Sequence, residues 1–182
     1  MSKRLKHQSP ANGQQGFLSQ LARRIFARTV STQTGSASMS YQFARIDLSK
    51  TNYEPTVKWA KLEYPDIDQL NTIYRDYCRY KRFASVMPIF DSRYTDRMTD
   101  VIGYYDEKQL VAFSLIRRYD DKNALCDQFA WNYNNPKLRL GIETMKTECA
   151  IYKQRGFQYL YLEQAHLYKS EIDGFEILGP LE

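Results

Sequence analysis

Three side chains in the second half of the sequence are of types that can transfer protons. His166 is one of only two histidines in the chain, and imidazole is the side chain whose ordinary pKa lies near neutrality. Glu163 follows an apolar run and Asp127 lies inside another, and either carboxylate could act as a base. Each residue also has a structural interpretation. Glu163 can cap a following helix, Asp127 can pair with Arg117 or Arg118 across a hairpin, and a histidine beside aromatic rings is commonly a packed side chain.

Other kinds of chemistry have little support in the sequence. The three cysteines are odd in number, far apart and outside any C-x-x-C pattern, which predicts neither a disulfide framework nor a zinc site. They favour a reducing compartment, and hence an intracellular, cytoplasmic protein. Two histidines exclude a multi-histidine metal site, so no metal is expected. The absence of an apolar run of about 18 residues predicts no transmembrane segment.

The positive charge of the chain belongs to its N-terminus. The sequence has 26 Lys and Arg against 21 Asp and Glu, and its first acidic residue is Asp47. Seven cations precede that residue: Lys3, Arg4, Lys6, Arg23, Arg24, Arg28 and Arg45. The remaining 19 cations against 21 anions leave residues 47–182 with a net charge of −2. That part of the chain has no general electrostatic reason to bind nucleic acid.

We therefore divide the sequence into a flexible basic arm, residues 1–46, and a domain, residues 47–182. Within the arm, residues 17–28 place Leu18, Leu21 and Ile25 at helical spacing, and a small-polar linker follows. Three interpretations remain open. The arm can be a transit peptide of residues 1–38, which would make the protein mitochondrial, an arm that binds nucleic acid or a protein partner, or a disordered extension before Met39.

Apolar periodicity predicts the elements of the domain. Alternation predicts strands at 43–48, 58–64, 100–105, 109–118, 123–133, 157–163 and 175–178. A period of 3.6 residues predicts helices at 66–83 and 137–155, with a shorter helical segment at 165–170. The strand at 157–163 follows a helical crossover, so we expect it to run parallel to the strand at 123–133. The fold class is α/β (α+β), with a mixed, mostly antiparallel sheet and flanking helices.

This order of elements, over residues 66–182, resembles the Gcn5-related N-acetyltransferase (GNAT) superfamily. The segment from Ala165 to Glu176 is similar to its closing A-x-x-L-Y-x-x-x-G-F element, with two additional residues between Tyr168 and Gly174. The stretch from Leu138 to Leu162 is also similar to arginyl- and leucyl-tRNA-protein transferases. The resemblance implies acetyl-CoA or another acyl-CoA as donor, an amine as acceptor, and Tyr168 as the acid that protonates the leaving group.

The resemblance also directs attention to the turn before the helix at 137–155. The pyrophosphate of an acyl-CoA needs backbone N–H groups at a helix N-terminus, with glycine allowing close approach. The superfamily's [QR]-x-x-G-x-[GA] pattern is incomplete, since Leu138 and Glu143 replace its polar first and small last residues. The candidate donor-binding residues are Lys137, Arg139, Leu140, Gly141 and Ile142. The alternative is that Gly141 only permits close packing of the helix.

Three functions remain open from the sequence. The first is an acyl-CoA-dependent N-acyltransferase. The second is an aminoacyl-tRNA-dependent transferase, which would need a cationic face built from Arg75, Arg79, Lys81, Arg82, Arg117 and Arg118, or the arm, to bind tRNA. The third is a non-catalytic GNAT-like subunit or adaptor that binds a partner through its arm.

Overall fold

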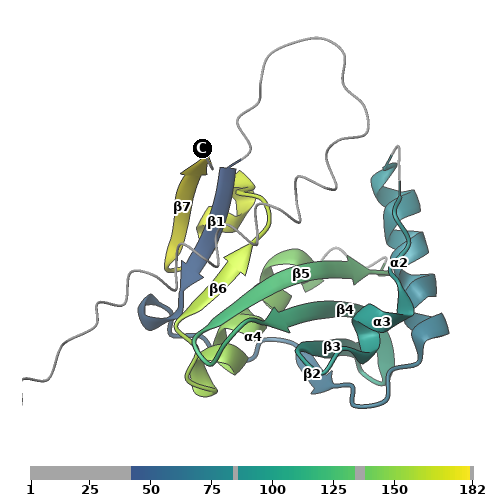
Figure 1. The fold of residues 1–182 in the computed structure, drawn as a ribbon. Coiled ribbons are helices and arrows are strands. Elements are labelled where there is room, and N and C mark those ends of the chain that lie inside the picture. The colour runs from purple at the N-terminus through teal and green to yellow at the C-terminus, as the bar shows by residue number, and fades with distance from the viewer. Residues whose placement is uncertain (1–41, 84–85, 134–137, 181–182) are drawn as a thin grey trace, which may run out of the picture. The chain divides into compact units, whose positions relative to one another are not determined.

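The computed structural model describes residues 42–83, 86–133 and 138–180 (Figure 1). The predicted arm helix at 17–28 and the candidate residue Lys137 lie outside these ranges. One seven-stranded sheet has the order β2-β3-β4-β5-β6-β1-β7. Its strands are β1 (Gln42–Asp47), β2 (Lys58–Lys61), β3 (Thr99–Asp106), β4 (Gln109–Arg118), β5 (Asn123–Trp131), β6 (Tyr159–Leu162) and β7 (Phe175–Pro180). The helices are α2 (Ile67–Lys81), α3 (Asp91–Thr95) and α4 (Leu140–Gln154), with 3-10 turns η1 (Leu48–Lys50) and η3 (Leu167–Glu171).

All neighbouring strands are antiparallel except β5 and β6, which run parallel as predicted. Their pairing extends only from Asn123 opposite Tyr159 to Cys126 opposite Leu162. Beyond that point β5 continues to Trp131 while β6 has ended, and the two strands separate (Figure 1). The sheet is therefore split open at the carboxyl ends of its one parallel pair.

Strand β1 lies between β6 and β7 and is antiparallel to both. Its side chains Phe43, Ala44 and Ile46 are buried. Residues 42–46, which the charge count groups with the arm, thus belong to the sheet. They join β6 to the edge strand β7.

The helices cover the two faces of the sheet. Successive β3 residues belong to different clusters of buried side chains, because strand side chains alternate between faces. Val101 packs in the cluster of Leu70 and Tyr94, from α2 and α3. Ile102 packs in the cluster of Met145, Cys149 and Tyr152, from α4. Helices α2 and α3 therefore lie on one face and α4 on the other.

Helix termini follow the sequence closely. Asp66 caps α2 by accepting a hydrogen bond from the Gln69 N–H at 3.0 Å. Gly156, with φ of +86°, stands just after α4, and its N–H donates to the Lys153 carbonyl at 3.0 Å. Among the described residues, no helix has the length and hydropathy needed to cross a bilayer.

Candidate functional site

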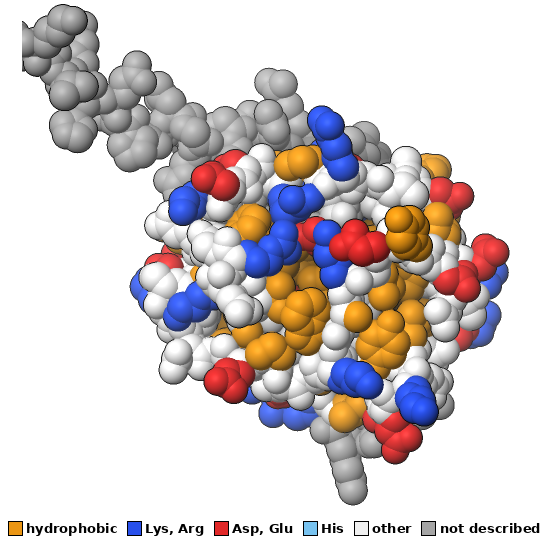
Figure 2. All heavy atoms as spheres, turned by 90° about the horizontal axis from the view of Figure 1, so that it is seen from below, with side chains coloured by type: hydrophobic (Ala, Val, Ile, Leu, Met, Phe, Trp, Pro, Cys, Tyr) orange, Lys and Arg blue, Asp and Glu red, His pale blue; other side chains and the backbone are white. Residues whose placement is uncertain are grey.

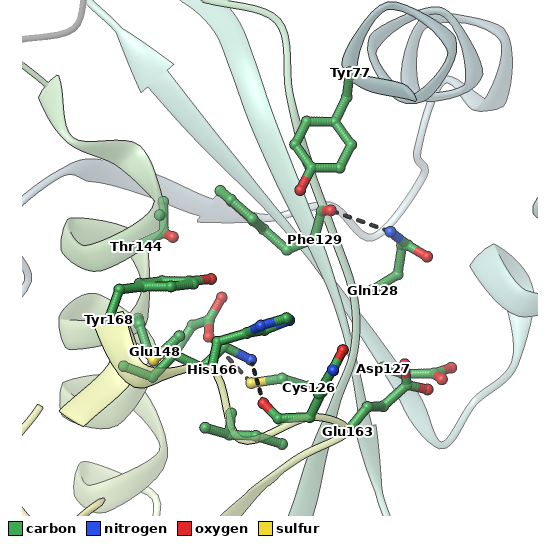
Figure 3. Close-up of a pocket in the computed structure, with 15 residues that line it drawn as sticks. Tyr77, Cys126, Asp127, Gln128, Phe129, Thr144, Glu148, Glu163, His166 and Tyr168 are labelled. Carbon is green, nitrogen blue, oxygen red and sulfur yellow. Dashed lines mark hydrogen bonds between the residues drawn. The ribbon is translucent and has the colours of Figure 1, made fainter. Parts of the chain in front are cut away.

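A pocket of about 220 Å³ opens where β5 and β6 separate. Its walls come from the end of the β5–β6 pairing, the first turns of α4, the turn η3 and Tyr77 of α2 (Figure 3). The groove at the split in the sheet is thus open rather than filled by side chains.

The pocket brings together the four residues predicted to transfer protons: Asp127, Glu163, His166 and Tyr168 all line it. The rings of His166 and Tyr168 stack with centroids 5.8 Å apart and an interplanar angle of 20°. Burial, followed by the charges of Lys169 and Lys81, lowers the pKa of His166. Burial and the nearby Glu148 raise the pKa of Tyr168, so its phenol stays protonated at neutral pH.

The predicted partners of Asp127 are wrong. Asp127 forms its ion pair with Arg93 of α3. Arg117 instead lies 3.9 Å from Asp96, and the Arg118 Nε atom lies 3.5 Å from Asp100. The periodicity gave no sign of the five-residue helix α3, which brings Arg93 over β5.

Glu163 does not cap the following turn. The N-cap position of η3 is His166 rather than Glu163, and the His166 side chain makes no capping hydrogen bond. The carboxylate of Glu163 instead lines the pocket, on the same side as Asp127 in the view of Figure 3.

Glu148, the most buried carboxylate of the pocket, was not among the residues predicted from the sequence. Its side chain, on α4, is 4% exposed. Its Oε1 atom accepts hydrogen bonds from the Ser114 hydroxyl at 2.5 Å and the Tyr104 hydroxyl at 2.7 Å. The Cys126 thiol donates to Oε2 at 3.2 Å. Burial raises the pKa of Glu148, against the opposing effects of these three donors and of Lys169.

A sequence signal for Glu148 exists. Glu148 lies on α4 three residues after Met145 and four before Tyr152, two buried apolar residues at helical spacing. A carboxylate in such a position is rarely buried without hydrogen-bond partners. Its presence within an apolar helical period therefore indicates a polar site beneath the helix.

Lys169 and Cys126 complete the polar part of the pocket. Lys169 donates from Nζ to the Gln164 carbonyl at 3.1 Å. Burial lowers its pKa, while Cys126, Glu148 and Glu163 act in the opposite direction. Burial, and secondarily Glu148, raises the pKa of Cys126 far above its ordinary value. Cys126 is therefore a protonated hydrogen-bond donor rather than a nucleophilic thiolate.

Gly141 leaves open space at the N-terminus of α4. A Cβ atom built on Gly141 would meet nothing within 4 Å, and the residue lines the pocket. The interpretation that Gly141 only permits close helix packing is therefore wrong, because no neighbour approaches it. A ligand can reach the backbone of the first helical turn at this point.

The other candidates at this turn differ in what they present. The side chains of Leu140 and Ile142 are buried in the core, so only their backbone groups are available to a ligand. Arg139, directly before the helix with φ of +42°, pairs with Glu171 at 2.8 Å. Both partners are more than half exposed, so the pair is weakly held and can open to an anion. Within the described residues, no group of His, Cys, Asp and Glu could hold a metal ion.

Comparisons with known proteins relate the chain to others through its fold. No protein-family model matches the sequence, and no curated protein matches it significantly. Solved structures do match. The GCN5-related glucosamine N-acetyltransferase region of a fungal multi-domain GH3 β-N-acetylglucosaminidase aligns with a TM-score of 0.53 at 12% identity, over 89% of this chain and 22% of that one.

A second solved structure is the C-terminal DUF2156 domain of an Agrobacterium fabrum protein assigned as a lysylphosphatidylglycerol synthetase. It aligns with a TM-score of 0.51 at 14% identity, over 69% of this chain and 47% of that one. The chain thus spans less than half the length of either protein. These likenesses confirm the predicted fold, and the resemblance to tRNA-protein transferases stays a prediction.

Proposed function

Because the domain has the GNAT fold, we propose that it transfers an acyl group from an acyl-CoA thioester to an amine. The observation that carries the proposal is the pocket at the split between β5 and β6. It joins the open N-terminus of α4 to a buried carboxylate, Glu148, and a protonated phenol, Tyr168. An anion site, a base and an acid are the groups that this reaction requires.

The reaction has one bond to form and one to break. The amine nitrogen attacks the thioester carbonyl carbon, the C–N bond forms, and the C–S bond breaks. The nitrogen loses a proton to a base, and the departing sulfur gains one from an acid. The raised pKa of Tyr168 keeps the phenolic proton available for the sulfur.

We assign Glu148 as the proton acceptor. Its pKa is raised from the ordinary value by burial, which moves a carboxylate toward the range useful for a base near neutrality. His166, whose pKa is lowered, and Glu163 line the same pocket and contact the incoming amine in this proposal. In this proposal the Cys126 thiol, whose pKa is raised, stays protonated and donates to Glu148 rather than carrying the acyl group.

The size of the pocket indicates which part of the donor it can enclose. A volume of about 220 Å³ is below the range of about 300–1,000 Å³ typical of sites that enclose a drug-sized ligand. It suits the thioester end and the amine, with the phosphates outside. The backbone at Gly141 and the guanidinium of Arg139 would hold those phosphates.

The test is binding and turnover with acetyl-CoA and with a longer acyl-CoA. Donor at 100 times its dissociation constant should stabilise the folded chain by about 2.7 kcal/mol. Tyr168→Phe should retain this stabilisation but lower turnover about 10²-fold, because only the proton donor is lost. Absence of both a thermal shift and binding heat with every acyl-CoA tried would refute the proposal.

The aminoacyl-tRNA-dependent alternative has no specific observation in its favour. Its proposed cations do not form one face. Arg79 lies near the start of β4, because the neighbouring Tyr80 contacts Trp131, and Trp131 pairs with Ala112 of β4. Arg117 and Arg118 lie at the other end of that strand. Salt-dependent tRNA binding to the full chain would restore this alternative. The adaptor alternative depends on residues 1–41 of the arm, which lie outside the described residues.

A further inference from the structure

Large apolar side chains are exposed around the mouth of the pocket. Leu167 is 84% exposed and Tyr80 67%, and three further apolar side chains nearby are more than half exposed. We call these residues the rim: Tyr80, Phe83, Met87, Phe90 and Leu167. Apolar side chains this exposed, gathered around one opening, indicate a surface for another apolar body.

Contacts and chain position place Phe83, Phe90 and Leu167 near the pocket, while Met87, whose carbonyl accepts from the Tyr74 hydroxyl at 3.0 Å, lies beside α2. The Phe83 ring lies 5.9 Å from that of Tyr77, which lines the pocket. Phe90 is the N-cap of α3, the helix whose Arg93 binds the pocket residue Asp127. Leu167 stands between the pocket residues His166 and Tyr168. The C-terminal end of α2 and the starts of α3 and η3 thus lie beside residues of one pocket.

The rim is also cationic. Lys81 and Arg82 end α2 between Tyr80 and Phe83. Arg79 pairs with Asp76, whereas no ion pair in the described part of the chain includes Lys81 or Arg82. The charge of Lys81 contributes to the lowered pKa of His166, so it acts close to the pocket. Lys81 lies over the Tyr77 ring, with its Nζ atom 5.9 Å from the ring centroid. Exposed aromatic and aliphatic side chains beside cations without an ion pair are the composition of protein surfaces that bind anionic membranes.

We propose that the rim docks on an anionic phospholipid surface, with the mouth of the pocket turned toward the bilayer. Apolar rim side chains would enter the boundary between headgroups and acyl chains, and Lys81 and Arg82 would meet lipid phosphates. An amine acceptor would then be taken from a molecule held at the membrane surface, a consequence that rests on the proposed acyl transfer.

Charge favours an anionic bilayer over two other possible occupants of the rim, segment 17–28 of the chain and a second copy of the chain. The amphipathic segment 17–28 of the chain carries Arg23, Arg24 and Arg28 and no acid, so the rim cations repel it. A second copy of the chain would bring the same cations against themselves. An anionic bilayer attracts both the rim and the acid-free segment, and their two contributions act together.

The opposite face offers a comparison. The end of β2 and the β2–α2 connection lie on the lower side of Figure 1, and Figure 2 shows that side with apolar side chains in its middle and Lys and Arg side chains beside them. Lys61, at the end of β2, lies 3.0 Å from Glu63 and 3.6 Å from the buried Asp100. Its charge is neutralised within the protein, unlike that of Lys81. Tyr64, in the same connection, is 98% exposed and supplies a matched control.

The test is co-sedimentation of the full chain with vesicles of phosphatidylcholine alone or mixed with phosphatidylglycerol. We expect binding to the mixed vesicles only, falling steeply with added salt. The double variant Lys81→Glu, Arg82→Glu should weaken binding at least tenfold, and the double variant Phe83→Ser, Leu167→Ser should weaken it to a similar extent. Tyr64→Ser should bind like the wild type.

Two results would overturn the proposal. One is failure of the full chain to bind mixed vesicles. The other is unchanged binding by both rim variants while deletion of residues 1–38 abolishes it, which would assign the membrane to the arm alone. Melting temperatures establish that each variant is folded. Acyl-CoA binding, measured without vesicles, reports on acyl transfer separately, so either proposal can fail without the other.

Discussion

Two buried carboxylates connect α4 to β3, and they have opposite surroundings. Asp100, on β3, is 1% exposed and accepts from the Tyr152 hydroxyl and the Arg155 guanidinium of the α4 end, each at 2.7 Å. Glu148, on α4, is 4% exposed and accepts from the Tyr104 hydroxyl of β3. In one contact the sheet supplies the acid and the helix the tyrosine. In the other the roles are exchanged.

The difference lies in the neighbouring charges. Arg155, Arg118 and Lys61 all approach Asp100 within 4 Å. Burial opposes ionisation of Asp100, but the hydrogen bonds and charges outweigh it and lower its pKa. Glu148 accepts from three uncharged donors, and burial raises its pKa although the charge of Lys169 acts in the opposite direction. A carboxylate with a lowered pKa stays ionised and is suited to a structural ion pair. A carboxylate with a raised pKa is a stronger base and can accept a proton in a reaction.

Replacement of Glu148 should have the largest effect on activity. Glu148→Gln keeps an oxygen that can accept from Tyr104 and Ser114 but removes the proton acceptor. We expect acyl transfer to fall about 10²- to 10⁴-fold, while the free energy of unfolding changes by about 1 kcal/mol or less. The acidic limb of the pH–rate profile should disappear with the carboxylate. Steady-state kinetics across pH and urea denaturation measure both effects.

The control for that variant is Glu176→Gln, on the edge strand β7. Glu176 pairs with Arg45 and Lys50 on the surface, so its loss should leave activity unchanged. Wild-type activity in Glu148→Gln would show that Glu148, like Asp100, is only structural, and would end the contrast between the two carboxylates.

Replacement of Asp100 should lower stability and leave turnover unchanged. Asp100→Asn leaves three cations near a group that no longer compensates them, and we expect a loss of about 3 kcal/mol of stability. Turnover per folded molecule should stay near that of the wild type, since Asp100 does not line the pocket. Activity measured well below the melting temperature, normalised to the folded fraction, checks this. A large fall in turnover with little loss of stability would reverse the roles assigned to the two residues.

The pH dependence of stability should have opposite signs at the two sites. The lowered pKa of Asp100 gives stability that is present above its unfolded pKa of about 3.9 and is lost as the pH falls through the folded value. The raised pKa of Glu148 makes the folded state bind its proton more tightly, so stability rises as the pH falls toward its unfolded value of about 4.3.

Urea denaturation of each variant against the wild type, across pH, isolates these contributions. The stability that the wild type holds over Asp100→Asn should shrink in acid. The stability of the wild type relative to Glu148→Gln should improve as the pH falls through the raised folded pKa of Glu148. Parallel trends for the two variants would show that their surroundings do not differ as the structure indicates.

Local patterns predicted much of the fold, and long-range contacts account for what was missed. The helical period of α4 was predicted correctly because it depends on neighbouring residues. The placement of β1 between β6 and β7 follows from pairing across nearly the whole chain, which alternation within one strand does not encode. The ion pair of Asp127 with Arg93 depends on how a short helix docks. Glu148 could have been identified from the sequence, because a carboxylate interrupts the apolar face of α4.

The smallest expected effect concerns the same helix at its open end. Gly141→Ala places a methyl group where nothing lies within 4 Å, and the backbone there does not require a positive φ. Alanine should therefore stabilise the folded chain by up to about 1 kcal/mol. If acyl-CoA phosphates approach this turn, the methyl group should also raise the KM for the donor several-fold while kcat stays constant, because the chemistry occurs at Glu148 and Tyr168. Stabilisation without any change in KM would mean that the donor lies elsewhere, and that α4 contributes only its buried carboxylate to the pocket.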